Sequence, residues 1–118
     1  MRKIPVLTLS IAAAGPIAAA RFVGFDEAQV SVAGRVAMGV SDYAASAAGK
    51  QVAVHVLGTA PVESGGPFAK GDLLKADANG RAIARGADGA VLARALQASA
   101  AAGAMPEVLL LPSRDAIA

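Results

Sequence analysis

Glycine and proline interrupt this chain at short intervals, and their spacing limits what the chain can fold into. The 118 residues include 13 glycines and 6 prolines, with short runs of valine, isoleucine and leucine between them. Both residue types are poorly suited to the interior of helices and strands, so each regular segment is confined to a few residues. Short apolar runs bounded by turn residues are typical of β-strands. The sequence therefore predicts a mainly β protein, a small single-domain β-barrel or sandwich with short helical turns in its alanine-rich segments.

Nine segments have the pattern of strands. In the clearest one, residues 50–57, Val52, Val54 and Val56 alternate with other side chains, so the valines face one side. The turn at residues 77–80, Asp-Ala-Asn-Gly, predicts a hairpin because Asn-Gly readily supplies the positive φ of a tight turn. The other expected strands are residues 4–11, 21–25, 29–32, 35–40, 73–76, 81–84, 91–96 and 107–111.

The first twenty residues allow two interpretations. Leu7, Leu9 and Ile11 recur at every second position, which favours an extended N-terminal arm with one apolar face. The basic start, apolar middle and three alanines at 18–20 also resemble a secretory signal, although two prolines interrupt it. We favour an arm and small-residue connection at 1–20, a β domain at 21–112 and a loose tail at 113–118. The alternative is a secreted or periplasmic small β-domain binding protein with an N-terminal signal segment.

One unit occurs twice in the sequence. Residues 38–49 contain an alanine-rich bend that ends in glycine and leads into the valine strand at 52–56. Residues 92–103 repeat this order and lead into the strand at 108–111. Such a repeat fits two related edges of one barrel or sandwich. Chance similarity between two alanine-rich segments is the alternative.

The apolar content of the chain overstates its core. Hydrophobic residues make up 55% of the sequence, but 31 residues are alanine. The free energy gained by burial scales with apolar area, at about 25 cal/mol per Å², and alanine buries little. We therefore expect a modestly stable protomer that forms a homo-oligomer or completes its core against a partner.

The side chains needed for catalysis or cofactor binding are scarce. The chain has no cysteine and one histidine, and its net charge is only +2. His55 lies in the middle of an expected strand, where an interface or face-pointing role is favoured over catalysis. The loop at residues 65–72 has its lysine and glycines in the wrong order for a phosphate-binding loop, so Phe68 is interpreted as a plug into the core or a neighbouring subunit. We predict no enzyme activity, no cofactor and no metal site.

Two classes of partner are also disfavoured. No cluster of lysine and arginine appears and aromatic residues make up 3%, so the charge and stacking that nucleic-acid binding requires are missing. No apolar run reaches the ~20 residues that a membrane-spanning helix needs. What remains is a folded surface for protein partners, with Leu7, Leu9, His55 and Phe68 as the candidate interface residues.

The order and spacing of several segments resemble the capsid cement, or head decoration, proteins of tailed bacteriophages. The segments are 21–24 (Arg-Phe-Val-Gly), 39–40 (Gly-Val), 47–54 (Ala-Ala-Gly-Lys-Gln-Val-Ala-Val), 56–59 (Val-Leu-Gly-Thr), 70–74 (Lys-Gly-Asp-Leu-Leu), 77–82 (Asp-Ala-Asn-Gly-Arg-Ala), 94–96 (Arg-Ala-Leu) and 108–111 (Val-Leu-Leu-Leu).

The resemblance implies a structural virion protein. It implies a mainly β chain, made in the host cytoplasm, that assembles on the outside of the phage head as a homotrimer or, less favoured, a dimer. Its partner would be the major capsid protein, whose neighbouring subunits it would bridge. An extended arm could add itself to the edge of a capsid sheet.

Overall fold

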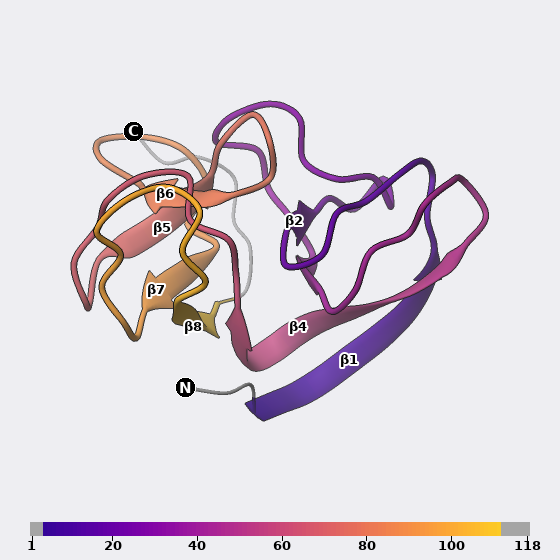
Figure 1. Cartoon of the computed structure of the whole chain (residues 1–118), viewed down its shortest axis with the longest axis horizontal. Coiled ribbons are helices and arrows are strands. Elements are labelled where there is room, and N and C mark those ends of the chain that lie inside the picture. The colour runs from indigo at the N-terminus through magenta and orange to yellow at the C-terminus, as the bar shows by residue number, and fades with distance from the viewer. Residues whose placement is uncertain (1–3, 112–118) are drawn as a thin grey trace.

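The computed structural model describes residues 4–111, and in this range the chain forms eight strands and no helix. Figure 1 shows the strands in two groups, with β4 running from one group to the other. The strands are β1 (Ile4–Ala12), β2 (Phe22–Val23), β3 (Gly39–Ser41), β4 (Gln51–Pro61), β5 (Leu73–Ala76), β6 (Ala82–Ala84), β7 (Ala93–Ala95) and β8 (Glu107–Leu110). The mainly β class predicted from the sequence is confirmed.

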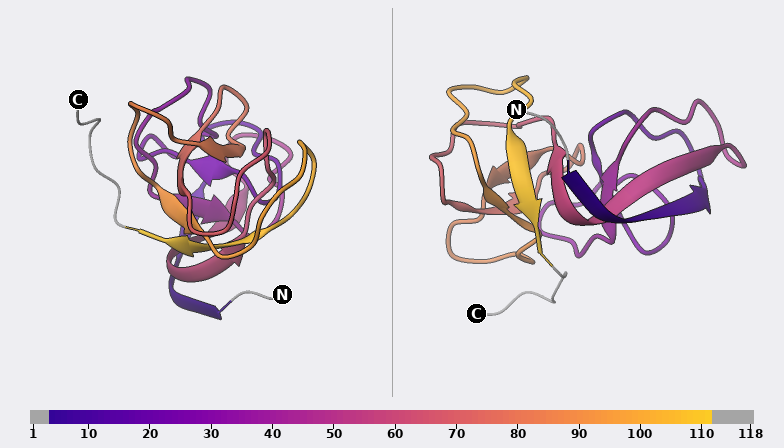
Figure 2. Two further views of the ribbon diagram at one scale, coloured as in Figure 1. Left: turned by 90° about the vertical axis from the view of Figure 1, so that its left-hand side faces the viewer. Right: turned by 90° about the horizontal axis from the view of Figure 1, so that it is seen from below.

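All eight strands belong to one sheet, with the order β2-β3-β4-β8-β7-β5-β6 and with β1 paired to β4. The two longest strands, β1 and β4, lie side by side and antiparallel, from Ile4 opposite Thr59 to Ala12 opposite Gln51 (Figures 1 and 2). Of the segment expected to form an N-terminal arm and connection, residues 4–12 thus lie in a paired strand.

The long strand β4 connects the two groups of strands. Its first half pairs with β3, where His55 lies opposite Val40. Its second half pairs with β8, where Gly58 lies opposite Leu110. Every pairing in the sheet is antiparallel, as expected for strands joined by turns and short loops.

Two apolar clusters fill the protein. The smaller one lies beside β1 and the first half of β4, where Val52 and Val54 are buried and Val56 packs against them, as their alternation predicted. The larger cluster contains Phe22, Phe68 and Leu74 together with many alanines. Small side chains make up much of both clusters, so the buried area per residue is limited.

The sequence repeat corresponds to a structural one. We call residues 4–57 the first repeat and residues 58–111 the second repeat. The Gly49 amide donates to Ala13 at 2.8 Å, and at the matching place the Gly103 amide donates to Ser64 at 2.9 Å.

A second pair of bonds follows the same correspondence. The Ala20 amide donates to Ser41 at 3.0 Å, and the Gly71 amide donates to Ala95 at 2.8 Å. Ala20 and Gly71 both have a positive φ, of 57° and 92°. The matching bonds make β1 equivalent to the second half of β4, and the first half of β4 equivalent to β8.

One local expectation is confirmed and several others differ from the structure. The hairpin after β5 forms, and Gly80 has a φ of 74°. The alanine-rich segments at 41–49 and 97–103, expected to form either short helical turns or loops, contain no helix: beyond Ser41 of β3 they are loops whose backbone groups bond to neighbouring loops. Expected strands at 29–32 and 35–40 shrink to a bridge at Gln29 and the start of β3. Gly34 bonds instead to Ala76 and Ala90 of the second repeat.

Candidate functional site

Four of the nine exposed large hydrophobic side chains of the described residues lie on β1. Ile4 and Val6 are 64% and 76% exposed, and Leu7 and Leu9 are each 42% exposed. Only Ile11, further along the same strand, is buried among the core residues. The alternating pattern that predicted an apolar face therefore places one residue in the core and leaves Leu7 and Leu9 at the surface.

Another exposed leucine, Leu109 of β8, lies in the same row of the sheet as Ile4. Ile4 is opposite Thr59, and Thr59 is opposite Leu109 of β8. Residues directly opposite in antiparallel strands project from the same face. Ile4 and Leu109 therefore flank Thr59 on one side of the sheet, and both are exposed.

His55 is buried beneath this strand, with 4% of its surface exposed. Its Nδ1 atom lies 3.0 Å from the Thr8 hydroxyl, and its Nε2 atom lies 3.3 Å from Asp42 Oδ1. The imidazole thus connects β1 to β4 and to the loop after β3. A hydroxyl, an imidazole and a carboxylate are brought together, but none of the three lines the hollow formed by residues between Gly24 and Val36.

Phe68 is also buried, at 7% exposure, and belongs to the larger apolar cluster. Its amide and carbonyl exchange two hydrogen bonds with Ser99, of 3.0 and 2.9 Å. The side chain therefore plugs the core of its own protomer, which is one of the two roles expected for it. Of the four candidate interface residues, Leu7 and Leu9 are the two that reach the surface.

A chain of polar contacts anchors the start of β1. The Ile4 amide donates to the Thr59 hydroxyl at 2.8 Å, and that hydroxyl bonds to the buried Glu107 carboxylate. The Glu107 amide in turn donates to the Gln97 side chain at 2.8 Å. The pairing of β1 with β4 brings these groups together, and no local sequence motif predicts these contacts.

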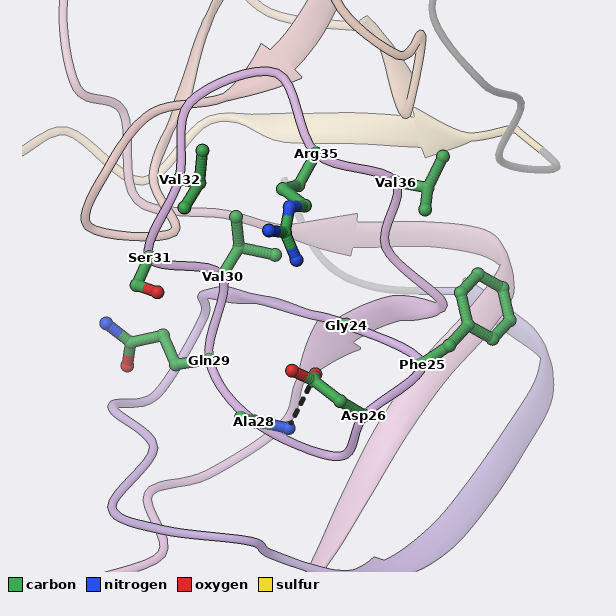
Figure 3. A pocket seen from close by; sticks show the side chains of 10 residues that line it. All are labelled: Gly24, Phe25, Asp26, Ala28, Gln29, Val30, Ser31, Val32, Arg35 and Val36. Carbon is green, nitrogen blue, oxygen red and sulfur yellow. Dashed lines mark hydrogen bonds between the residues drawn. The ribbon is translucent and has the colours of Figure 1, made fainter.

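A hollow of about 200 Å³ lies beside the loop after β2 (Figure 3). Val30, Val32 and Val36 form part of its wall, and the Asp26 carboxylate and Arg35 guanidinium point into it. Asp26 accepts a hydrogen bond of 3.2 Å from the Ala28 amide, as expected of a turn acid. The apolar wall, with one charge of each sign, gives no specific ligand chemistry.

Residues 4–111 contain no group of three His, Cys, Asp or Glu side chains that could hold a metal ion. In that described part, no helix is long and apolar enough to cross a membrane.

Comparison with known proteins identifies the family. The sequence model of the phage cement protein family matches residues 1–111. The chain belongs to the phage cement protein family. This cement protein is therefore a structural protein of a phage head, associated with the capsid.

A solved structure shows the same fold. The N base of the head fiber protein gp8.5 of bacteriophage phi29 aligns with a TM-score of 0.72 over 92% of this chain and 96% of that one. The two sequences are 16% identical, so the likeness concerns the fold. No curated protein sequence matches the cement protein.

Proposed function

We propose that this cement protein binds the outer surface of the phage head and stabilises the shell by bridging neighbouring major capsid subunits. The observation that supports this is the exposed aliphatic surface of β1 and β8 on a member of the cement protein family. Large exposed apolar patches on soluble proteins mark interaction surfaces. Leu7 and Leu9 contribute contact area in the assembled head, and the row from Ile4 to Leu109 faces the shell.

The bridging would act through binding free energy alone. A protein that buries surface on two capsid subunits must be released from one of them before they separate, so its binding free energy adds to shell stability. Each contact can be weak, because an oligomer of this chain engages several sites together and symmetry repeats the arrangement over the head. The homotrimer and the less favoured dimer that the resemblance implies would both supply this multiplicity.

His55 and Phe68 would support this role from inside the protomer. His55 forms a hydrogen bond with Thr8 and lies 3.3 Å from Asp42, so it would help to fix β1 against the sheet. Phe68 fixes the loop before β5. Neither side chain needs to touch a partner for the outer surface of β1 to keep its shape.

Binding to undecorated heads tests the proposal. Purified protein is mixed with such heads, the heads are sedimented, and the bound copies are counted as protein is added. We expect saturation at a fixed number of copies per head, and weaker binding for Leu109→Lys. The matched control Val32→Lys changes an exposed residue outside this row and should bind normally. Heads that retain no protein at any concentration would overturn the proposal.

A further inference from the structure

The outer edge of β1 has no partner strand within residues 4–111. β1 pairs with β4 along one edge, and no other described strand or bridge involves it. Its nine residues, Ile-Pro-Val-Leu-Thr-Leu-Ser-Ile-Ala, carry no charge. Long uncharged edges promote pairing with another chain, and natural proteins usually shorten, charge or cover them. This edge has one such device, Pro5, which lacks an amide donor.

The second repeat indicates what covers such an edge. The second half of β4 is the equivalent of β1, and it is paired on both sides. β8 covers one edge, with Leu110 opposite Gly58. The start of β1 covers the other edge, with Pro5 opposite Gly58 and Ile4 opposite Thr59. The edge that is open in the first repeat is thus filled in the second by an antiparallel strand.

The covering strand, β1, is itself the first strand of a repeat, which we call its opening strand. Within one protomer, the opening strand of the first repeat covers the opening strand of the second. The second half of β4 has both edges occupied, so among residues 4–111 β1 is the opening strand that still has a free edge. We propose that the outer edge of β1 pairs antiparallel with β1 of a second copy of this chain, forming a two-fold symmetric dimer.

Pro5 determines which residues can take part. Because proline has no amide hydrogen, we place the segment that pairs with a partner strand between Val6 and Ala12. Its pairing with β4 is irregular on both sides of Leu7 and regular from Thr8 to Ala12. The centre of the segment from Val6 to Ala12 is Leu9, so a two-fold axis through it places Leu9 opposite Leu9 of the second copy. Leu7 is then opposite Ile11 of the second copy. The partly exposed Leu7 and Leu9 would then be covered by Ile11 and Leu9 of the second copy, respectively. No like charges would be brought together, because β1 is uncharged.

Such a contact is isologous, since the same segment is used by both partners, and it closes at two copies. It therefore selects the dimer from the two oligomers that the resemblance implies. The dimer does not depend on the proposed binding to the shell. If both hold, each dimer carries two shell-facing rows from Ile4 to Leu109, and one dimer can reach two neighbouring capsid subunits.

Charge exchange at Leu9 tests the dimer and its symmetry axis. Sedimentation equilibrium of the native chain is compared with Leu9→Lys, Leu9→Glu and an equimolar mixture of these two variants. We expect the native chain to approach twice its 11.6 kDa mass as concentration rises. Each variant alone should dimerise at least tenfold more weakly, because two like charges then face each other. The mixture should regain dimerisation, because Lys then faces Glu.

Each other outcome counts against the dimer. Dimers in all four samples would mean that another surface forms them, and a mass three times that of the chain would mean a different symmetry. A native chain that remains a monomer at millimolar concentration would also overturn it, even if the chain decorates heads normally. A mixture that stays monomeric would contradict a two-fold axis at Leu9 and so overturn the proposed pairing. Val32→Lys serves again as control and should dimerise as the native chain does.

Discussion

Ile17 and Phe68 occupy the same position in the two repeats. Ile17 exchanges two backbone hydrogen bonds with Ala45, of 2.9 and 2.8 Å, and Phe68 exchanges two with Ser99, of 3.0 and 2.9 Å. Each residue follows a Gly-Pro pair in the sequence, and each side chain is buried. The two residues fill the smaller and the larger apolar cluster respectively.

Truncation at these two positions should therefore be costly in both repeats. We expect Phe68→Ala to lower the free energy of unfolding by about 3–5 kcal/mol and Ile17→Ala by about 2–5 kcal/mol, because each leaves a cavity in a packed cluster. Urea denaturation followed by circular dichroism measures both. Ile17→Val is the matched control and should lose about 1 kcal/mol. If Phe68→Ala were as stable as the native chain, the plug role of Phe68 would be wrong.

Removal of the buried imidazole should loosen β1. His55→Ala leaves the Thr8 hydroxyl and Asp42 without this partner, and we expect a loss of about 2–3 kcal/mol. Amide hydrogen exchange should accelerate most in β1. Ser10→Ala removes a hydrogen bond to Gln51 at the exposed surface and should change stability by less than about 0.5 kcal/mol. Unchanged exchange in β1 after His55→Ala would show that the imidazole does not hold the strand.

The crossing of β1 over Gly58 should not tolerate a side chain. A Cβ atom there would lie 2.3 Å from the Ile4 carbonyl oxygen, and Gly58 has a φ of 101°. We expect Gly58→Ala to cost about 3 kcal/mol, from the φ penalty and from displacement of β1. Gly103 also has a positive φ, of 95°, but a Cβ atom there would meet no heavy atom within 4 Å. Gly103→Ala should therefore cost only about 1–2 kcal/mol. Equal losses for the two variants, in parallel urea titrations, would contradict the close approach.

A carboxylate between two arginines links the repeats. Glu63 lies 3.2 Å from Arg21 Nη2 and 2.8 Å from Arg81 Nε, and all three side chains are partly buried. We expect Glu63→Gln to lower the unfolding free energy by about 1–2 kcal/mol, less at high salt. Asp88→Asn breaks the pair with Lys75, but Asp88 is 83% exposed, so stability should barely change. The unfolding free energies of both variants are measured at low and high salt. Equal losses for the two variants at both salt concentrations would contradict a stabilising role for the Glu63 carboxylate.

Sequence patterns predicted the parts of the fold that depend on local chemistry. The valine alternation in β4, the hairpin at Gly80 and the glycine-terminated bends all report local backbone preferences. The repeat was visible only in part. Gly15-Pro16 before Ile17 matches Gly66-Pro67 before Phe68, and this pairing would have extended it across most of the chain.

The contacts around the candidate site depend on pairing between distant segments. Thr8 meets His55 across 47 residues, and Thr59 meets Glu107 across 48. No local motif predicts either contact. Each depends on the register in which two long strands pair, and that register is altered by the irregularities beside Leu7. The burial of His55 follows from its place between β1 and β3, which alternation along one strand could not reveal.

The temperature at which DNA-filled heads release their DNA tests the central claim most directly. Heads lacking the cement protein are heated with and without added native protein, and release is followed with a DNA-binding dye. We predict that saturating protein raises the release temperature and that Leu109→Lys, at the same concentration, raises it less. Heads that bind the native protein to saturation yet release DNA at an unchanged temperature would contradict the claim that it stabilises the shell.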